Sequence, residues 1–287
     1  MGFFSKLMHQ SQPAACVLPE THAVIRQIVT VLGFDVVSLP EYASRLAPAI
    51  NSAVAYLDQQ IAAIPGPLDI SAAHYMHHPV VHAMFPARNE IAHAIGRSLE
   101  VKQPLAFLAG AEQHEAFALL GVRRKLNEPP GAPPVFIDHT LRSLAATESG
   151  ARQGLRTAAM MRLVTAFGEH LAHLRKNDKL TRQEWNIENL ADPRIADADK
   201  GQLLVAAQEL SPDKLLAGLI AWLQRPSEYL QIGAGAAAQD AELKIDALPL
   251  LVCRDRRRWL VCLVRFPTAE GVAAIHGEPR QHRYITI

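Results

Sequence analysis

The sequence predicts an α+β protein with a helix-rich body, one long amphipathic helix and a small C-terminal antiparallel sheet. The long helix is predicted at residues 147–177, where apolar residues recur three or four positions apart and charged residues fall largely between them. Short β-prone segments separated by turn residues follow residue 227. We therefore expect an irregular lead-in at 1–20, a helix-rich body at 21–226, and at 227–287 a small antiparallel β region packed on that body.

Composition and charge limit the class of protein. The chain has 287 residues, 49% hydrophobic and 20% charged, which excludes large-scale disorder and is enough for one or two cores. The net charge of +1 gives no overall field that would hold nucleic acid or an anionic membrane. Three cysteines without metal-type spacing fit a reducing cytosol, so we expect a cytoplasmic protein.

Membrane attachment is expected to be absent or weak. The sequence has no run of about 18 uncharged apolar residues, so it predicts no transmembrane segment. The first ten residues, MGFFSKLMHQ, lack the long apolar region and cleavage site of a secretory signal. Phe3, Phe4, Leu7 and Met8 beside Lys6 allow a weak N-terminal contact with a membrane surface, but an irregular or docked terminus is the simpler expectation.

The first half of the chain is predicted to be a series of helices. A helical period over residues 21–32 ends at Gly33, and Ser38 followed by Pro40 predicts the start of the next helix. Pro48 lies about two turns into that helix and is expected to kink or split it. Further helices are expected near three ranges: 79–84, 87–98 and 103–115.

A hairpin is possible at residues 117–139. Phe117–Lys125 and the segment 134–139 are β-prone and flank the proline-rich loop 128–133. This pattern slightly favours a hairpin over an extension of the preceding helix. Such a hairpin would be able to join the C-terminal sheet and tie it to the body.

Two helix starts and several strands are predicted after the long helix. Thr181–Glu184 has the form of a capping box, which predicts a separate, shorter helix ending near Leu190. Ser211 followed by Pro212 predicts another helix start. The clearest hairpin joins residues 248–253 to 258–266. The remaining expected elements are a helix at 196–210 and strands at 228–232, 242–247 and 283–287.

The chain has 13 histidines, several of them in residues 74–82. His74, His78 and His82 are spaced four apart and would share one face of an unbroken helix. Pro79 disfavours a helical residue before it, so the helix is expected to begin at Pro79. We therefore expect three partly exposed histidines that do not share a face.

A metal site is the main alternative to a plain interaction protein. Glu90-x-x-His93 is half of the ligand pattern found in di-iron helical bundles, but the sequence has no second Glu-x-x-His. A single half-motif is equally consistent with a solvated helix face. A di-iron or zinc site would draw on six side chains: Glu90, His93, Glu112, Glu115, His170 and His173.

A dinucleotide-binding pattern is present at residues 233–238, which match G-x-G-x-x-A after a short predicted strand. Asp255 lies near the distance of a ribose-binding acid. The residues that follow are predicted to form an antiparallel hairpin, however, and not the βαβ units that such a site needs. A flexible connection, with Asp255 in the hairpin turn, is the better interpretation.

The densest positive cluster is predicted at the tip of the 248–266 hairpin. It consists of four arginines beside an aromatic residue: Arg254, Arg256, Arg257, Arg258 and Trp259. Arginine beside an aromatic is typical of contacts with phosphate or single-stranded nucleic acid. The same residues also keep an exposed turn solvated and discourage aggregation of sheet edges. The neutral chain favours the second interpretation.

The sequence contains no recognisable catalytic constellation. Motifs for a serine nucleophile elbow, a zinc protease, a P-loop and a redox C-x-x-C are missing. Cys253 and Cys262 lie in apolar strands and are expected to be inert. Asp138 next to His139 fits a capping or turn aspartate. We predict no catalytic residue and no cofactor.

The leading functional hypothesis is a cytosolic, non-enzymatic interaction or adaptor protein. It would bind another protein through a helical surface or a sheet edge. This hypothesis rests on the amphipathic helices and on the missing catalytic motifs. Metal binding is the alternative, and nucleic-acid contact through the arginine tip is the third possibility.

Overall fold

The computed structural model has a mixed helix and sheet fold, which confirms the predicted class. It describes six ranges: 19–32, 38–125, 135–191, 210–233, 248–253 and 258–277. The helices are α1 (Pro19–Leu32), α2 (Tyr42–Ala62), α3 (Pro79–Met84), α4 (Arg88–Arg97), α5 (Leu99–Gly110), α6 (Glu148–Ala191), α8 (Pro212–Leu223), the 3₁₀ helix η1 (Pro226–Glu228) and α9 (Thr268–Gly277). The strands are β1 (Leu68–Asp69), β2 (Glu115–Arg124), β3 (Phe136–Ala145), β4 (Leu230–Gly233), β5 (Leu250–Cys253) and β6 (Arg258–Pro267).

These elements form two compact units. Unit 1 comprises Met1–Ala53 and Arg162–Arg225, and unit 2 comprises Val54–Met161 and Pro226–Ile287. The division therefore passes through α2 and through α6. Unit 2 takes residues from both sides of position 226, and the predicted three-part division of the chain remains a prediction.

The described part of unit 1 is helical. Its helix α8 packs on α6, where the Trp222 indole Nε1 donates a hydrogen bond to the Leu163 carbonyl oxygen at 3.1 Å. The Trp222 ring also meets Phe167 edge-on, with ring centroids 5.5 Å apart. Helix α1 is joined to the first part of α2 by the Thr21 hydroxyl, which donates to Asn51 Oδ1 at 3.0 Å. An apolar stripe on each helix forms the buried side of this unit.

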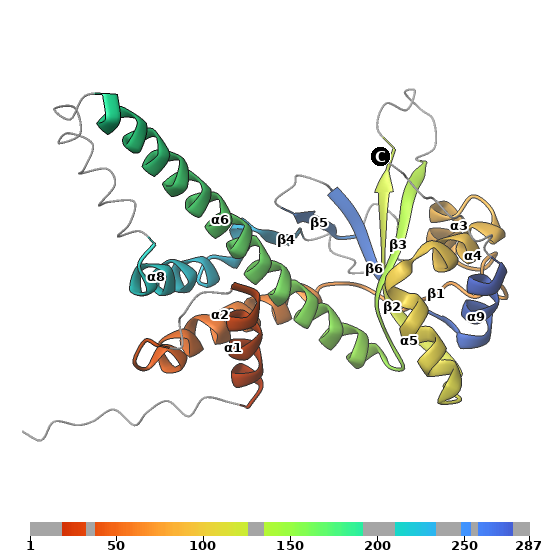
Figure 1. Cartoon of the computed structure of the whole chain (residues 1–287). Helices are drawn as coiled ribbons and strands as arrows, with labels where there is room; N and C mark the ends of the chain where they lie inside the picture. Colours follow the sequence, from red (N-terminus) through yellow and green to blue (C-terminus); the bar gives the residue numbers. More distant parts are fainter. Residues whose placement is uncertain are drawn as a thin grey trace, which may run out of the picture. The chain divides into compact units, whose positions relative to one another are not determined.

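Unit 2 is built around a six-stranded sheet with the strand order β3-β2-β6-β5-β4 (Figure 1). These strands pair antiparallel, and β1 pairs in parallel with β6. The hairpin predicted in the middle of the chain is confirmed as β2–β3, and the C-terminal hairpin is confirmed as β5–β6. Because β2 pairs with β6, the two hairpins belong to one sheet.

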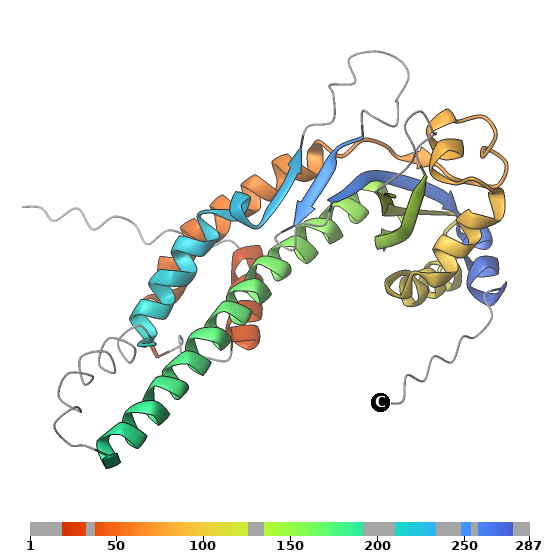
Figure 2. The same ribbon diagram turned by 90° about the horizontal axis from the view of Figure 1, so that it is seen from above.

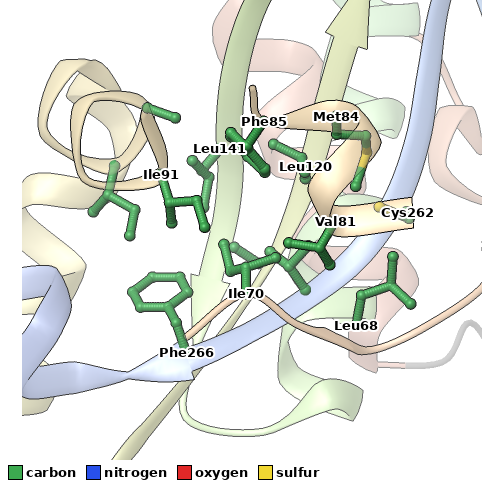
Figure 3. Packing of buried hydrophobic residues seen from close by; sticks show 14 of the residues in the cluster. Leu68, Ile70, Val81, Met84, Phe85, Ile91, Leu120, Leu141, Cys262 and Phe266 are labelled. Carbon is green, nitrogen blue, oxygen red and sulfur yellow. The ribbon is translucent and has the colours of Figure 1, made fainter. Parts of the chain in front are cut away.

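One face of the sheet is covered by α3, α4, α5 and α9 (Figures 1 and 2). Leu120 of β2 and Phe266 of β6 meet Val81 of α3 and Ile91 of α4 in the main core of this unit (Figure 3). The start of α9 approaches α5 closely at Gly271. A Cβ atom at this position would lie 2.7 Å from the Phe266 ring and 2.8 Å from Leu105. The core therefore requires glycine at position 271.

The opposite face of the sheet is covered in part by the first turns of α6. A Cβ atom at Gly154 would lie 3.4 Å from the Ser143 Cβ of β3, so the helix and strand are in contact. Leu119, Val261 and Leu263 do not belong to the main core cluster, yet all three are buried. The sheet is therefore buried on both faces near its centre.

Helix α6 is longer than the sequence predicts. The capping box at 181–184 suggested a new helix, but α6 continues without interruption to Ala191, so that prediction is wrong. Thr181 lies inside the helix, and its hydroxyl donates to the Asn177 carbonyl oxygen at 3.1 Å. The residues before it contain no proline to end the helix, and the Asp178–Arg182 ion pair at 2.9 Å supports it.

Other elements differ from the prediction at their ends or were missed. Helix α2 begins at Tyr42, after the predicted start, and continues through Pro48 as one helix. Helix α5 begins at Leu99, before the predicted residue 103. Ser98 lies between α4 and α5, and its hydroxyl donates to the Ala94 carbonyl oxygen and accepts from the Leu141 backbone N–H, at 2.7 and 2.9 Å, which ties this junction to β3. Strand β1 and helix α9 were not predicted.

Several predicted features lie outside the described residues. They are the N-terminal segment with Phe3, Phe4, Lys6, Leu7 and Met8, the loop 128–133, the helix at 196–210 and the strands at 242–247 and 283–287.

Gly66 provides a test of how closely the chain approaches β6. Its φ is +114°, and a Cβ atom at this position would overlap the Leu263 carbonyl oxygen. We expect Gly66→Ala to lower the free energy of unfolding by at least about 2 kcal/mol, measured by urea denaturation. Gly110→Ala is the matched control, because a Cβ atom there meets nothing within 4 Å. A Gly66→Ala protein as stable as this control would contradict the packing described.

Arg152 joins the end of α2 to the start of α6 within unit 2. Its guanidinium donates to the carbonyl oxygens of Ile61 at 2.6 Å and Ile64 at 3.1 Å, and it also binds Glu148. These carbonyls belong to the last turn of α2 and the residues just after it, where the regular i+4 donors are missing, and Ile61 accepts only the Ile64 backbone N–H, at 3.1 Å, in their place. We expect Arg152→Met to lower the free energy of unfolding by about 1.5–3 kcal/mol.

The control for Arg152 is Arg142→Met. Arg142 forms an ion pair with Glu100 at 3.1 Å, and both side chains are more than half exposed. We expect its loss to change the free energy of unfolding by less than about 0.5 kcal/mol in the same urea titration. Equal effects of the two substitutions would show that the carbonyl contacts of Arg152 contribute little.

Candidate functional site

The six residues predicted as possible metal ligands are spread over several elements. Glu90 and His93 lie on α4, Glu112 follows α5, and Glu115 begins β2. Glu115 is 3.7 Å from the Arg265 guanidinium. His170 and His173 lie on the part of α6 that belongs to unit 1, where His170 stacks on Trp222. Among the residues that the structure describes, no group of three or more His, Cys, Asp or Glu is placed to hold a metal ion.

The arginine tip is described only in part. Arg254, Arg256 and Arg257 lie outside the described residues, whereas Arg258 is exposed at the start of β6 and Trp259 is half-buried. The sequence did not point to Arg123 of β2, whose guanidinium carbon lies 5.8 Å from the centroid of the Trp259 ring. Arg123 is also paired with Asp138 at 2.8 Å. This ring contact therefore stabilises the sheet, and the carboxylate reduces the local positive potential.

The histidine-rich segment forms a turn followed by a helix. As predicted, the helix begins at Pro79, and His78 occupies the extended position before it. His74 lies in the preceding turn, whereas His82 stacks on Tyr75 with ring centroids 5.2 Å apart. The three histidines therefore do not share one helix face.

A serine, a histidine and an aspartate do meet in this turn. Ser71 Oγ lies 2.9 Å from His74 Nδ1, and Asp69 Oδ2 lies 3.3 Å from the same nitrogen. A catalytic triad needs the serine on one ring nitrogen and the carboxylate on the other. Because both oxygens converge on Nδ1, the set orients the imidazole and cannot pass a proton from Ser71 through the ring to Asp69.

Asp69 is the electrostatic centre of this turn. Its partial burial raises the pKa of the carboxyl group, but hydrogen bonds from Ser71 and the positive charges of His74 and Arg265 outweigh this effect. The net result is a pKa below the ordinary value for aspartate. Its Oδ1 accepts the Ser71 backbone N–H at 2.9 Å, and Oδ2 lies 3.5 Å from Arg265. The ionised carboxylate therefore holds the turn against β6.

The lowered pKa of Asp69 makes its contribution to stability depend on pH. The folded state binds this proton more weakly than the unfolded state, so the contribution is present above the ordinary aspartate pKa of about 3.9 and is lost as the pH falls through the lower folded value. We expect Asp69→Asn to destabilise the protein near neutral pH, and the difference from wild type to shrink below about pH 4.

Urea unfolding between about pH 6 and about pH 3 measures this difference. Asp213→Asn is the control for loss of a carboxylate, because Asp213 is largely exposed and pairs with Arg45 at the surface of unit 1. A difference for Asp69→Asn that does not change with pH would contradict the assignment.

The remaining polar candidates have structural partners. Asp138 has a φ of +56° and lies at an irregularity in the pairing of β3 with β2. His139 Nε2 is 2.7 Å from the Met84 carbonyl oxygen, and its ring stacks on Phe85. Cys262 is a buried free thiol whose pKa is raised by burial to about 12, in agreement with the predicted packing role. Gly233 ends β4, while the rest of the glycine-rich segment and Asp255 lie outside the described residues.

The least expected feature of unit 2 is an exposed apolar surface on α5. We call it the α5 surface, and it consists of five exposed residues: Leu99, Gln103, Ala106, Phe107 and Gly110. Leu99 is 78% exposed and Phe107 is 75% exposed, although they are large apolar side chains. The opposite side of the helix buries Val101 and Leu105 in the core.

The helical spacing places these residues on one side of α5. Leu99 and Phe107 are separated by about 12 Å along the axis and about 80° around it. Gln103 and Ala106 lie between them, so the centre of the surface carries no charge. The sequence prediction missed this surface because it started the helix at residue 103 and so left Leu99 outside it.

The two edge strands of the sheet, β3 and β4, are both protected against pairing with a further strand. On β3, the register with β2 shifts twice, and Asp138 and Ser143 have positive φ near these shifts. Such bulges disrupt the regular row of edge groups. On β4, the Leu230 carbonyl oxygen accepts from the Tyr56 hydroxyl, and the Ile232 N–H donates to Gln60, at 2.9 and 2.8 Å.

Comparisons with known proteins identify no relative. No family model, curated protein or solved structure matches this chain. None of the helices in the described part of the chain has the length and apolar character needed to cross a bilayer.

Proposed function

We propose that this protein binds another protein through the α5 surface. The observation that carries the proposal is the exposure of Leu99 and Phe107 on a helix whose other side is already buried in the core. Full burial of a side chain of this size contributes about 1.5–3 kcal/mol, so two of them supply a useful part of a protein–protein affinity. Their closeness on one helix fits a partner that receives them in an apolar groove.

Both edges of the sheet are poorly suited to pairing with a partner strand, which favours binding through a helical surface. A partner strand added to β3 would meet two bulges, and one added to β4 would have to displace Tyr56 and Gln60. Helix α5 needs no such rearrangement. A cytoplasmic location belongs to the same proposal and is supported by the free thiol of Cys262, which suits a reducing compartment.

The proposal is tested by placing a photo-crosslinking amino acid at Gln103, in the centre of the α5 surface, in cells that naturally contain the protein. We expect a discrete protein adduct from this position. The double substitution Leu99→Glu/Phe107→Lys should lower its yield at least about tenfold, because both apolar contacts are lost. These charges suit the two ends of the helix dipole, so the fold of α5 is preserved.

Two controls make this experiment decisive. Met76 is also large, apolar and 71% exposed, but it lies outside α5, so Met76→Glu should leave the adduct unchanged. The crosslinker at Ala83, an exposed residue of α3, should give no adduct with the same partner. The proposal would be refuted if the double variant gave as much adduct as the wild-type chain. It would also be refuted if the crosslinker at position 103 gave no adduct that the crosslinker at Ala83 does not give. Analytical ultracentrifugation shows whether the partner is a second copy of the chain.

A further inference from the structure

A separate hollow lies in unit 2 between α4 and α9, which are adjacent in Figures 1 and 2. We call it the α4–α9 groove. Its volume is about 750 Å³, within the range of small-molecule sites. The groove involves none of the residues of the α5 surface, so any role it has is independent of the proposed protein interaction.

The groove is open because facing positions carry small side chains. Ala273, Ala274 and Gly277 line it from α9, and Ala92 lines it from α4. Its apolar floor includes Ile91, which is almost fully buried, as is Ala274. A ligand in the groove would therefore rest mainly on apolar atoms.

Polar side chains join this apolar floor as further lining residues. Arg88, Asn89 and His93 come from α4, and Glu270 comes from α9. The Glu270 carboxylate already accepts the Ala72 backbone N–H at 2.9 Å, which satisfies part of its hydrogen-bonding capacity. Within the described part of the chain, no hydrogen bond or ion pair engages the side chain of Arg88 or Asn89.

Arg88, which has no partner among the described residues, favours an anionic group of the ligand at its end of the groove. Arg88 is an exposed lining residue, and a neutral apolar ligand lying against its guanidinium would displace water without giving it a partner, which costs free energy. A carboxylate at Arg88 would instead form charge-assisted hydrogen bonds, and Asn89 would be able to donate a further one. Glu270 carries a negative charge of its own and accepts one backbone N–H, so an anionic group is placed at Arg88 on α4 and not beside Glu270 on α9.

We propose that the α4–α9 groove binds a small amphipathic carboxylate. The carboxylate group lies at Arg88 and Asn89, and the apolar chain covers Ile91, Ala274 and the other small residues of the floor. The class of ligand is a short- or medium-chain organic acid with an unbranched or compact apolar body.

Isothermal titration of the full chain with decanoate, below its micelle-forming concentration, tests this proposal. We expect saturable binding with one site per chain. Arg88→Gln should weaken decanoate binding by about tenfold, because a charge-assisted hydrogen bond is lost. Decanol has the same chain without the carboxylate, so Arg88→Gln should leave its weaker binding unchanged.

Two substitutions fill the groove from opposite walls. Ala273→Trp and Ala92→Phe both start from exposed positions, and each should lower the affinity for decanoate and decanol at least tenfold. Ala83→Trp, at an exposed position of α3 outside the groove, should not. Thermal unfolding followed by circular dichroism verifies that each variant is folded, and either filling variant is sufficient if the other fails.

The following results would overturn the proposal. They are an absence of saturable decanoate binding to the wild-type chain, and decanoate binding that persists in a folded filling variant. Equal weakening of decanoate and decanol by Arg88→Gln would also overturn it, because the carboxylate would then not be the group that Arg88 recognises.

Discussion

Unit 2 depends on the central strand β6, whose middle residues are buried on both faces of the sheet and which pairs along both of its edges. Val261 and Leu263 are buried on one face of the sheet, and Cys262 and Val264 are buried on the other. The strand also pairs with β2 along one edge and with β5 and β1 along the opposite edge. Each side chain in this run therefore has to be apolar, since a polar group would find neither water nor a partner. Strands β1, β2 and β5, which lie far apart in the sequence, all pair with this one strand.

The α5 surface follows from the way in which one helix serves this sheet. Val101 and Leu105 point into the core, and the Ser98 hydroxyl ties the junction before α5 to β3 by bonding to Ala94 and Leu141. These contacts set the rotation of α5 about its axis, and they leave Leu99 and Phe107 on the outer side. The exposure of these two residues is therefore a result of core packing and does not arise from a loose helix.

Sequence patterns predicted the parts of the fold that depend on local chemistry. The β5–β6 hairpin and the start of α3 at Pro79 were predicted because apolar runs, turn residues and proline act over a few positions. Helix α9 was missed because its Ala- and Gly-rich sequence has little apolar periodicity. The continuity of α6 was also missed, since a capping box is equally compatible with a helix interior. The α5 surface could not be predicted, because periodicity identifies an apolar stripe but not which apolar residues the neighbouring elements leave uncovered.

Helix α9 shows why the groove cannot be explained by core packing. At Gly271 the core demands a small residue, because any Cβ atom would collide with Phe266 and Leu105. The core makes no such demand at Gly277, because a Cβ atom there would meet nothing within 4 Å. Ala273 is likewise exposed, so the interior does not limit its size. Core packing thus accounts for Gly271. It does not account for Ala273 and Gly277, which leave open the α4–α9 groove that Arg88 and Glu270 help to line. The small residues on the groove side of α9 therefore fit the proposed role of this side, which is to leave room for a ligand.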